Sequence, residues 1–210
     1  CSEQELTEAR DRFLRFTRVR RLTRTGVLEA PGRVYVTGVL VKQVSAVFGY
    51  DLCDKRLLNR DRTVLDQSQV DSVVGEQLSK LVNVKLITRL VETVVEKCSG
   101  SPLLEASLYF IPVRLRAWVR AFYQAFGSHA CLASNSLSDA RAIEMGWRVL
   151  GSAELGRGLW WSLSRTFILT SEKVAARASQ SSGSRLQLPL TVAEKVVWDQ
   201  ARAIAKRVVS

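Results

Sequence analysis

The hydrophobic pattern near the start of the chain predicts a small β-sheet preceded by a helix. Residues 33–42 (RVYVTGVLVK) combine β-branched, aromatic and aliphatic side chains, and Thr37-Gly38 in their middle predicts a hairpin turn or a bulge. Residues 46–53 (AVFGYDLC) predict another short strand or an irregular crossing segment. Before the sheet, residues 4–16 place apolar side chains on one side of a predicted helix.

Helical periodicity replaces the strand pattern in the next part of the chain. Valines and leucines recur at helical spacing over residues 70–82, and Asp66 or Ser68 can cap this helix. Asn83 interrupts the pattern and can cap a second helix over residues 84–97.

The second half of the chain predicts parallel strand pairing. Residues 129–134 and 147–152 are two short apolar segments, each of strand length. A helix between them can be capped by Ser136 or Ser138 and stopped by Gly146. A strand–helix–strand unit of this length implies a right-handed crossover between parallel strands.

Three further segments complete this half. Residues 112–126 predict a helix with Pro112 at its start, and residues 153–163 predict a short helix. Residues 165–170 (RTFILT) predict a strand or the beginning of another helix. The fold class that follows is α/β (α+β).

Composition then divides the chain into domains. The Gly, Ser and Pro residues of 98–102 mark the best boundary, which gives an α+β domain over 1–98 and a small, three-layer-like α/β domain over 103–178. Residues 179–190 have the composition of a flexible linker. Residues 191–210 predict a C-terminal amphipathic helix that opens with a T-x-x-E capping box.

The net charge of the chain indicates what kind of partner it binds. The 210 residues are 47% hydrophobic, enough for a substantial core, yet the net charge is +11. Such a balance favours an anionic partner such as nucleic acid, a nucleotide phosphate or an acidic protein surface. A solvated, arginine-rich surface is the equally weighted alternative.

Several classes of protein are disfavoured by what the sequence lacks. A run of about 18 uncharged apolar residues is missing, and the first residues are charged, so we expect neither a membrane span nor a signal peptide. The first residue is Cys and the last residues are helical, so we expect a fragment of a longer cytoplasmic protein.

The cysteines and the histidine limit which metal sites and catalytic groups the chain can form. Widely spaced cysteines (Cys1, Cys53, Cys98 and Cys131) suit free thiols in a reducing compartment. With His129 as the single histidine, a zinc site or a histidine-dependent triad is nearly excluded. We expect Cys131 to be a small core residue and His129 to lie at the solvated end of a strand.

Common catalytic signatures are also missing: the chain contains no P-loop, GxGxxG, HExxH or GxSxG motif. Asp51, Asp54 and Asp61 could hold Mg²⁺, although loop aspartates more often form turns. The tryptophans, which include Trp118 and the pair Trp160-Trp161, are more often core residues than base-stacking ones. We predict no catalytic residue and no metal site.

The densest basic stretch runs from Arg10 to Arg24, with seven arginines against one acidic residue. Such an arm can bind a nucleic-acid backbone. The candidate contacts are Arg15, Arg18, Arg20, Arg21 and Arg24. Alternatively, the stretch is a charged edge that discourages strand pairing.

A second basic segment, RLLNRDRTV at 56–64, joins the predicted sheet to the next helix and is called the joint below. Backbone amides at a helix start, preceded by arginines, form a ready anion site. Arg60 and Arg62 are the candidate phosphate contacts, and Asn59, Asp61 and Thr63 would support the loop. Pairing of these arginines with nearby aspartates is the equally weighted alternative.

The series FLRF, RVYVTGVLV, FGYDL and LLNRDRT resembles the segment that follows the ATP-binding domain in some phage and bacterial ATPases. These belong to the GHKL superfamily of gyrase, a heat-shock chaperone, histidine kinases and MutL. The resemblance covers about residues 10–98. It implies a transducer domain with a ribosomal S5-like fold, in which Arg60 or Arg62 approaches the terminal phosphate of the nucleotide.

The chain also departs from the pattern of the superfamily. The magnesium-binding Asn box and the DxGxG adenine motif of the superfamily are missing, so ATP and Mg²⁺ would bind only in the parent protein. The expected partners are the upstream ATP-binding domain, a protein or nucleic acid, and a second copy of the chain. The alternatives are a non-catalytic nucleic-acid-binding protein that uses the Arg10–Arg24 stretch, and a structural module without a ligand.

Overall fold

The computed structural model describes residues 3–54, 57, 67–97 and 103–182. The chain is a mixed α/β protein of the α+β type, as predicted. It divides into two compact units, residues 1–174 and residues 175–210. Among the described helices, none combines the length and the apolar character needed to cross a bilayer.

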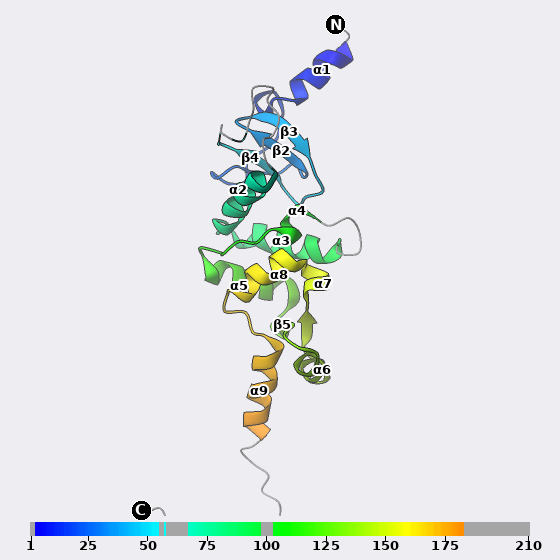
Figure 1. Ribbon diagram of the computed structural model, residues 1–210, viewed down its shortest axis with the longest axis vertical. Helices are drawn as coiled ribbons and strands as arrows, with labels where there is room; N and C mark the ends of the chain where they lie inside the picture. Colours follow the sequence, from blue (N-terminus) through cyan, green and yellow to red (C-terminus); the bar gives the residue numbers. More distant parts are fainter. Residues whose placement is uncertain (1–2, 55–56, 58–66, 98–102, 183–210) are drawn as a thin grey trace, which may run out of the picture. The chain divides into compact units, whose positions relative to one another are not determined.

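The first unit opens with a four-stranded mixed sheet in the order β1-β4-β2-β3 (Figure 1). Its strands are β1 (Val27–Leu28), β2 (Arg33–Val36), β3 (Val39–Gln43) and β4 (Gly49–Leu52). The hairpin of β2 and β3 is antiparallel and contains an irregularity at Val34/Tyr35, whereas β4 lies parallel to β2 and antiparallel to β1. The predicted hairpin and the predicted strand within 46–53 are therefore confirmed.

Both faces of this sheet are covered, because successive side chains of a strand point to opposite sides. Val34, Val36, Tyr50 and Leu52 belong to the main hydrophobic core. Their strand neighbours on the other face, including Tyr35, pack against the segment that precedes the sheet. The arginine-rich stretch is thus anchored on one face of the sheet.

That preceding segment is less helical than the sequence predicts. Helix α1 (Glu3–Asp11) ends well before residue 16, and a short 3-10 turn, η1 (Leu14–Phe16), follows. Between them the backbone pairs with the start of the edge strand β3: Phe13 bridges Val39, and the Leu40 amide donates to the Arg12 carbonyl at 2.7 Å. Pairing with the sheet competes successfully with helix continuation here.

The helices after the sheet bury its main face and each other. They are α2 (Gln67–Ser79), α3 (Val84–Glu96), α4 (Leu104–Ser107), α5 (Leu115–Phe126), α7 (Ser152–Leu155) and α8 (Arg157–Ser164). α2 contacts β4, α3 packs on α5, and α4 packs on α8 (Figure 1). Buried residues from both sides of the predicted boundary at 98–102 contribute to one core cluster, and the domain limits stay a prediction.

The helix ends show which local signals were informative. Asn83 caps α3 as predicted, since its side-chain oxygen accepts hydrogen bonds from the amides of Lys85 and Leu86. The predicted Ser68 cap is wrong, because α2 begins at Gln67; the alternative, Asp66, lies outside the described residues. The predicted single helix over 153–163 is interrupted at Gly156, which separates α7 from α8.

A two-stranded parallel sheet forms the last part of the first unit. β5 (Ala130–Leu132) pairs with β6 (Arg148–Leu150) through the crossover helix α6 (Ser136–Glu144), as predicted. The cap of α6 is Asn135 rather than Ser136 or Ser138, because the extended Asn135 accepts the Ser138 amide at 2.9 Å.

The residues around these strands follow the sequence in part. Gly146, with φ of 79°, follows the last turn of α6 as predicted. Residues 165–170 form no full strand; Thr170 alone bridges Leu132, and α9 (Ser171–Ser182) follows. α9 includes residues 179–182 of the predicted linker, and the predicted C-terminal helix lies outside the described residues.

Candidate functional site

The turn between β2 and β3 adopts a conformation that threonine rarely takes. Thr37 and Gly38 have φ angles of 49° and 80°, both positive as in a type I′ hairpin turn. A β-branched residue in this region carries a strain of about 1–2 kcal/mol. Hydrogen bonds offset it: the Thr37 amide donates to the Leu52 carbonyl at 2.8 Å, and the Gly38 carbonyl accepts from the Leu14 amide at 2.7 Å.

A buried carboxylate on β4 holds the same turn from the side. Asp51 is only 2% exposed, and its side chain accepts a hydrogen bond from the Gly38 amide at 3.0 Å. Its second oxygen forms an ion pair with Arg21, whose side chain is half exposed. A buried charge is tolerated only when it is paired in this way. Asp51 therefore ties both the turn and the arginine-rich stretch to the strand that leads into the joint.

Two open clefts flank this end of β4. The first, of about 520 Å³, is lined by Leu14, Arg15, Val19, Arg21, Thr37, Gly38, Asp51 and Cys53. The second, of about 460 Å³, is lined by Arg24, Thr25, Cys53, Asp54, Val73, Glu76, Gln77 and Lys80. Cys53, which directly follows β4, lines both. Cys53 is therefore a shared wall residue of the two clefts.

The five arginines proposed to contact nucleic acid do not form one free basic face. Arg20 pairs with Glu29 at 3.1 Å, and Arg21 pairs with Asp51. Arg15 stacks on the ring of Phe16, with its guanidinium 4.5 Å from the ring centre. Arg18 and Arg24 are exposed. Two arginines of this stretch therefore pair with carboxylates of the same chain, and which of the two readings of the stretch holds stays a prediction.

The residues of the joint that carry the phosphate-contact prediction lie outside the described residues. These are Arg60 and Arg62, with Asn59, Asp61 and Thr63 as predicted support. Their flanks are described: Leu57 is buried in the main core, and α2 begins at Gln67.

Asp51, one of the three aspartates considered as Mg²⁺ ligands, is engaged by other groups, and Asp61 lies outside the described residues. Asp51 uses its oxygens for Arg21 and Gly38, which leaves it a poor partner for Asp54 in binding Mg²⁺. Among the residues that the structure describes, no group of three or more His, Cys, Asp or Glu side chains is arranged for a metal ion.

A second buried carboxylate positions β4 from the other side. Glu105 on α4 is fully buried and accepts hydrogen bonds from the amides of Val47 and Phe48, at 3.0 and 3.1 Å, and from the Tyr50 hydroxyl at 2.6 Å. The Leu104 amide donates to the Ser45 carbonyl at 2.8 Å. One short helix therefore binds the loop before β4 through both backbone and side chain.

Burial sets the protonation of this pair. It raises the pKa of Glu105 above its ordinary value of 4.5, although the hydrogen bonds from Tyr50 and the backbone amides act in the opposite direction. Burial, and then the nearby Glu105 carboxylate, raise the pKa of Tyr50 well above 10.0. Tyr50 therefore remains a proton donor to Glu105 over the whole neutral range.

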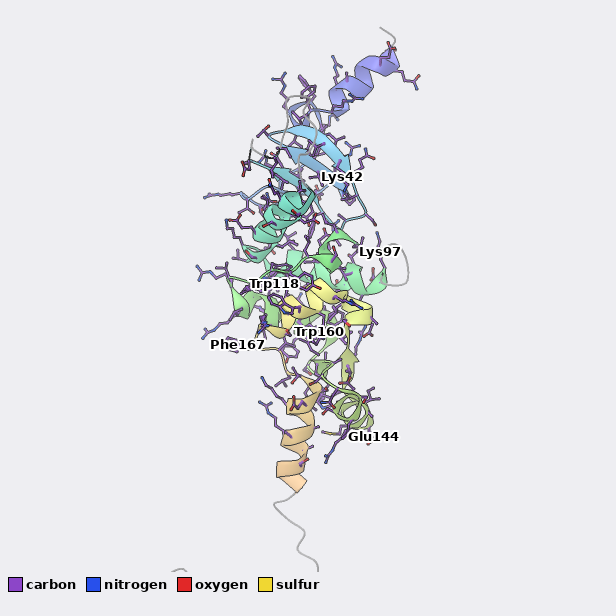
Figure 2. The ribbon with its side chains drawn as sticks, viewed as in Figure 1. Lys42, Lys97, Trp118, Glu144, Trp160 and Phe167 are labelled. Atoms are coloured by element: carbon purple, nitrogen blue, oxygen red, sulfur yellow. The ribbon has the colours of Figure 1, made fainter. Side chains whose placement is uncertain are left out.

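Three other residues singled out from the sequence, His129, Cys131 and Trp118, pack against neighbouring parts of the fold. His129 is exposed just before β5 and packs on Trp147, with ring centres 5.3 Å apart, as expected for the solvated end of a strand. Cys131 is fully buried, and burial followed by the charge of Asp139 raises its pKa to about 11, so its thiol is unreactive. Trp118 is fully buried in the core among the helices (Figure 2).

Sequence reasoning missed both buried carboxylates as organising groups. Glu105 stands alone between apolar residues in LLEASL, which could have marked it as buried. Its partners lie 55 to 58 residues away along the chain, and Arg21 is 30 residues from Asp51. Separations of this length leave no local signal in a single sequence.

The strained turn yields a testable prediction. Replacing Thr37 by Asn, which tolerates positive φ better, should raise the free energy of unfolding by about 0.5–1 kcal/mol, as measured by urea denaturation. The same replacement at Ser45, an exposed loop residue whose φ is not positive, should change it little. An equal gain at both positions would show that strain at the turn is not the cause.

Comparison of the chain with protein-family models, with curated proteins and with solved structures gives no match.

Proposed function

We propose that the chain belongs to a GHKL-type ATP-binding protein, in which it couples the nucleotide state to a partner. Residues 1–98 would act as the S5-like transducer domain, and residues 103–178 as a further three-layer-like α/β domain. The ATP-binding domain would lie upstream, and Arg60 and Arg62 would contact the terminal phosphate of its nucleotide. The parent protein would act in the cytoplasm.

The observation that carries the proposal is the construction of the end of β4. Asp51 ties the Thr37-Gly38 turn and Arg21 to this strand, and Glu105 ties its other face to α4. Cys53, which follows this strand and stands three residues before the joint, lines two open clefts. A strand end held by hydrogen bonds would suit an arginine that contacts a phosphate at a defined position. Preorganised cations stabilise charge without reorganisation.

The distribution of charge points to the joint rather than to its surroundings. In the first cleft, Arg15 and Arg21 face Asp51, and in the second, Arg24 and Lys80 accompany Asp54 and Glu76. The lining charges are thus of mixed sign. The joint itself has three arginines and one aspartate over residues 56–63. An excess of arginine fits bidentate contact with phosphate oxygens.

The nucleic-acid alternative receives less support. Two of its five arginines, Arg20 and Arg21, form ion pairs with carboxylates of the same chain. A phosphate backbone would have to displace those carboxylates, which lowers the gain from each contact.

The proposal is tested on the gene product extended upstream of Cys1. Replacing Arg60 or Arg62 by Ala should lower the turnover number for ATP hydrolysis by about 10²–10³-fold, the usual effect of removing one group that stabilises transition-state charge. Steady-state phosphate release measures the effect. Arg→Lys at the same position should restore only part of it, since lysine lacks the bidentate geometry.

Arg120→Ala serves as the matched control, because this arginine is exposed on α5 and belongs to neither cleft. It should leave turnover unchanged. An extended protein that neither binds nor hydrolyses ATP would refute the proposed function, as would full activity in both joint variants.

A further inference from the structure

An open groove on the helical part of the first unit is lined mainly by apolar side chains. It measures about 760 Å³, and its walls come from three segments that are distant in sequence. The lining residues are Val82, Val113, Arg114, Leu115, Arg116, Ala117 and Phe167. This set is called the α5 groove below.

The apolar side chains of the α5 groove are unusually exposed for their type. Phe167 is 73% exposed, Val113 64% and Val82 59% (Figure 2 labels Phe167). Ile111 and Tyr109, which precede Val113 along the chain, are also more than half exposed. Single exposed apolar residues are ordinary, but a contiguous group around a hollow marks an interaction surface.

The backbone around the α5 groove is held in place by a hydrogen bond and by helix packing. The Val113 amide donates to the Ser79 carbonyl at the end of α2, at 2.9 Å. Leu115 and Ala117 lie in the first turn of α5, which packs on α3 through its buried face. A partner would thus meet a prearranged surface, which lowers the entropy cost of binding.

Charge at the groove has one sign. Arg114 and Arg116 are exposed, and none of the described residues that line the groove is acidic. Within the part of the chain that the structure describes, no carboxylate forms an ion pair with either guanidinium. α5 carries Arg116 and Arg120 and no acidic residue at all.

We propose that the α5 groove binds a protein segment that presents apolar side chains beside acidic ones. The apolar residues of the partner would cover Val82, Val113 and Phe167, and its carboxylates would pair with Arg114 and Arg116. This binding concerns residues outside both β4 clefts, so it holds whether or not the joint contacts a nucleotide.

The chemistry of the lining favours a protein over nucleic acid. Bases bind single strands by stacking on aromatic rings, whereas four of the seven lining residues are aliphatic and one is aromatic. Aliphatic walls with arginines at the rim match an amphipathic segment laid into a groove. Complementary charge then selects the acidic form of such a segment.

The test begins with a displayed library of random peptides selected on the full chain. Peptides that bind the bare support are removed by counter-selection. The recovered peptides should combine apolar residues with Asp or Glu. Fluorescence anisotropy should show their Kd rising at least tenfold in the charge-reversal variant and in Val113→Asp/Phe167→Asp.

Matched controls lie elsewhere on the same unit. Arg141→Glu/Arg157→Glu reverses two exposed arginines, and Leu137→Asp/Ile143→Asp changes two exposed apolar residues of α6. Neither should alter the Kd by more than about twofold, which corresponds to roughly 0.4 kcal/mol. Circular dichroism of every variant checks that the fold is intact.

Three results would overturn the proposal. Recovered peptides could lack acidic residues or bind the controls and groove variants alike. An oligo(dT) strand could bind the chain and lose binding in the groove variants, which would assign the surface to nucleic acid. Sedimentation could reveal a dimer of the chain that the groove variants abolish, which would assign it to a second copy.

Discussion

Glu105→Ala is expected to lower the free energy of unfolding by about 3–5 kcal/mol, because three buried donors lose their acceptor and each unsatisfied group costs about 1–3 kcal/mol. The change removes the acceptor shared by two backbone amides and the Tyr50 hydroxyl, all of them buried. Urea denaturation measures the loss, and the Tm should fall by roughly 10 °C. Glu144→Ala, on the exposed surface of α6 (Figure 2), should change stability by less than about 0.5 kcal/mol.

The partner of Glu105 provides an internal check. Tyr50→Phe alone should cost about 1–3 kcal/mol, because it leaves a buried acceptor of Glu105 without its hydrogen-bond donor. The double variant should cost less than the sum of the two single variants, since both remove the same contact. Strictly additive losses would contradict the network.

The same carboxyl gives stability a dependence on pH. The folded-state pKa of Glu105 is raised above 4.5, so the folded state holds this proton more tightly than the unfolded state does. Its contribution to stability is fully present below the unfolded pKa and is lost as pH rises through the folded pKa. Glu105→Gln should remove this part of the pH dependence.

Gly156→Ala is expected to cost about 3–5 kcal/mol of stability, from two causes that can be separated. Gly156 has φ of 74° and ψ of 151°, a region that only glycine readily adopts. An added Cβ would also lie 2.5 Å from the Ala106 carbonyl oxygen and 2.6 Å from the Ala106 Cβ. Backbone strain accounts for about 1–3 kcal/mol and overpacking for a similar amount.

Gly127 offers a control with almost the same backbone conformation. Its φ is 88° and its ψ is 166°, and an added Cβ would meet nothing within 4 Å. Gly127→Ala should therefore show the backbone cost alone, and the difference between the two variants measures the close approach of α8 to α4. Equal losses at the two glycines would show that this approach contributes nothing.

The features that the sequence predicted correctly depend on neighbours in the chain. The Thr37-Gly38 turn, the Asn83 cap and the Gly146 stop each follow from contacts within a few residues. The Ser136 or Ser138 cap was wrong for the same local reason, since Asn135 occupies the better position one residue earlier. Signals of this kind lie within a few residues of the feature that they predict, so they can be recognised in a single sequence.

The candidate site depends on contacts that leave no recognisable pattern in the sequence. Arg21 reads as one arginine among seven in its stretch, and only the fold shows that it neutralises the buried Asp51. Phe167 is exposed, and residues 165–170, for which the sequence predicts a strand or the beginning of a helix, form only a single bridge at Thr170. The pairing of Arg21 and the exposure of Phe167 both depend on packing between residues that are far apart in the chain. Such packing cannot be recognised in a single sequence.

The backbone pairing of residues 12 and 13 with β3 has a consequence for how copies of the chain behave toward each other. An open edge strand is a template for sheet-to-sheet aggregation. Here the first half of β3 is occupied by the chain itself, and its far end carries the exposed Lys42. Arg12, which makes this pairing, is also exposed, and exposed cations along an edge disfavour the approach of a second positively charged copy. Colloidal stability is thus a use for the basic stretch that requires no ligand.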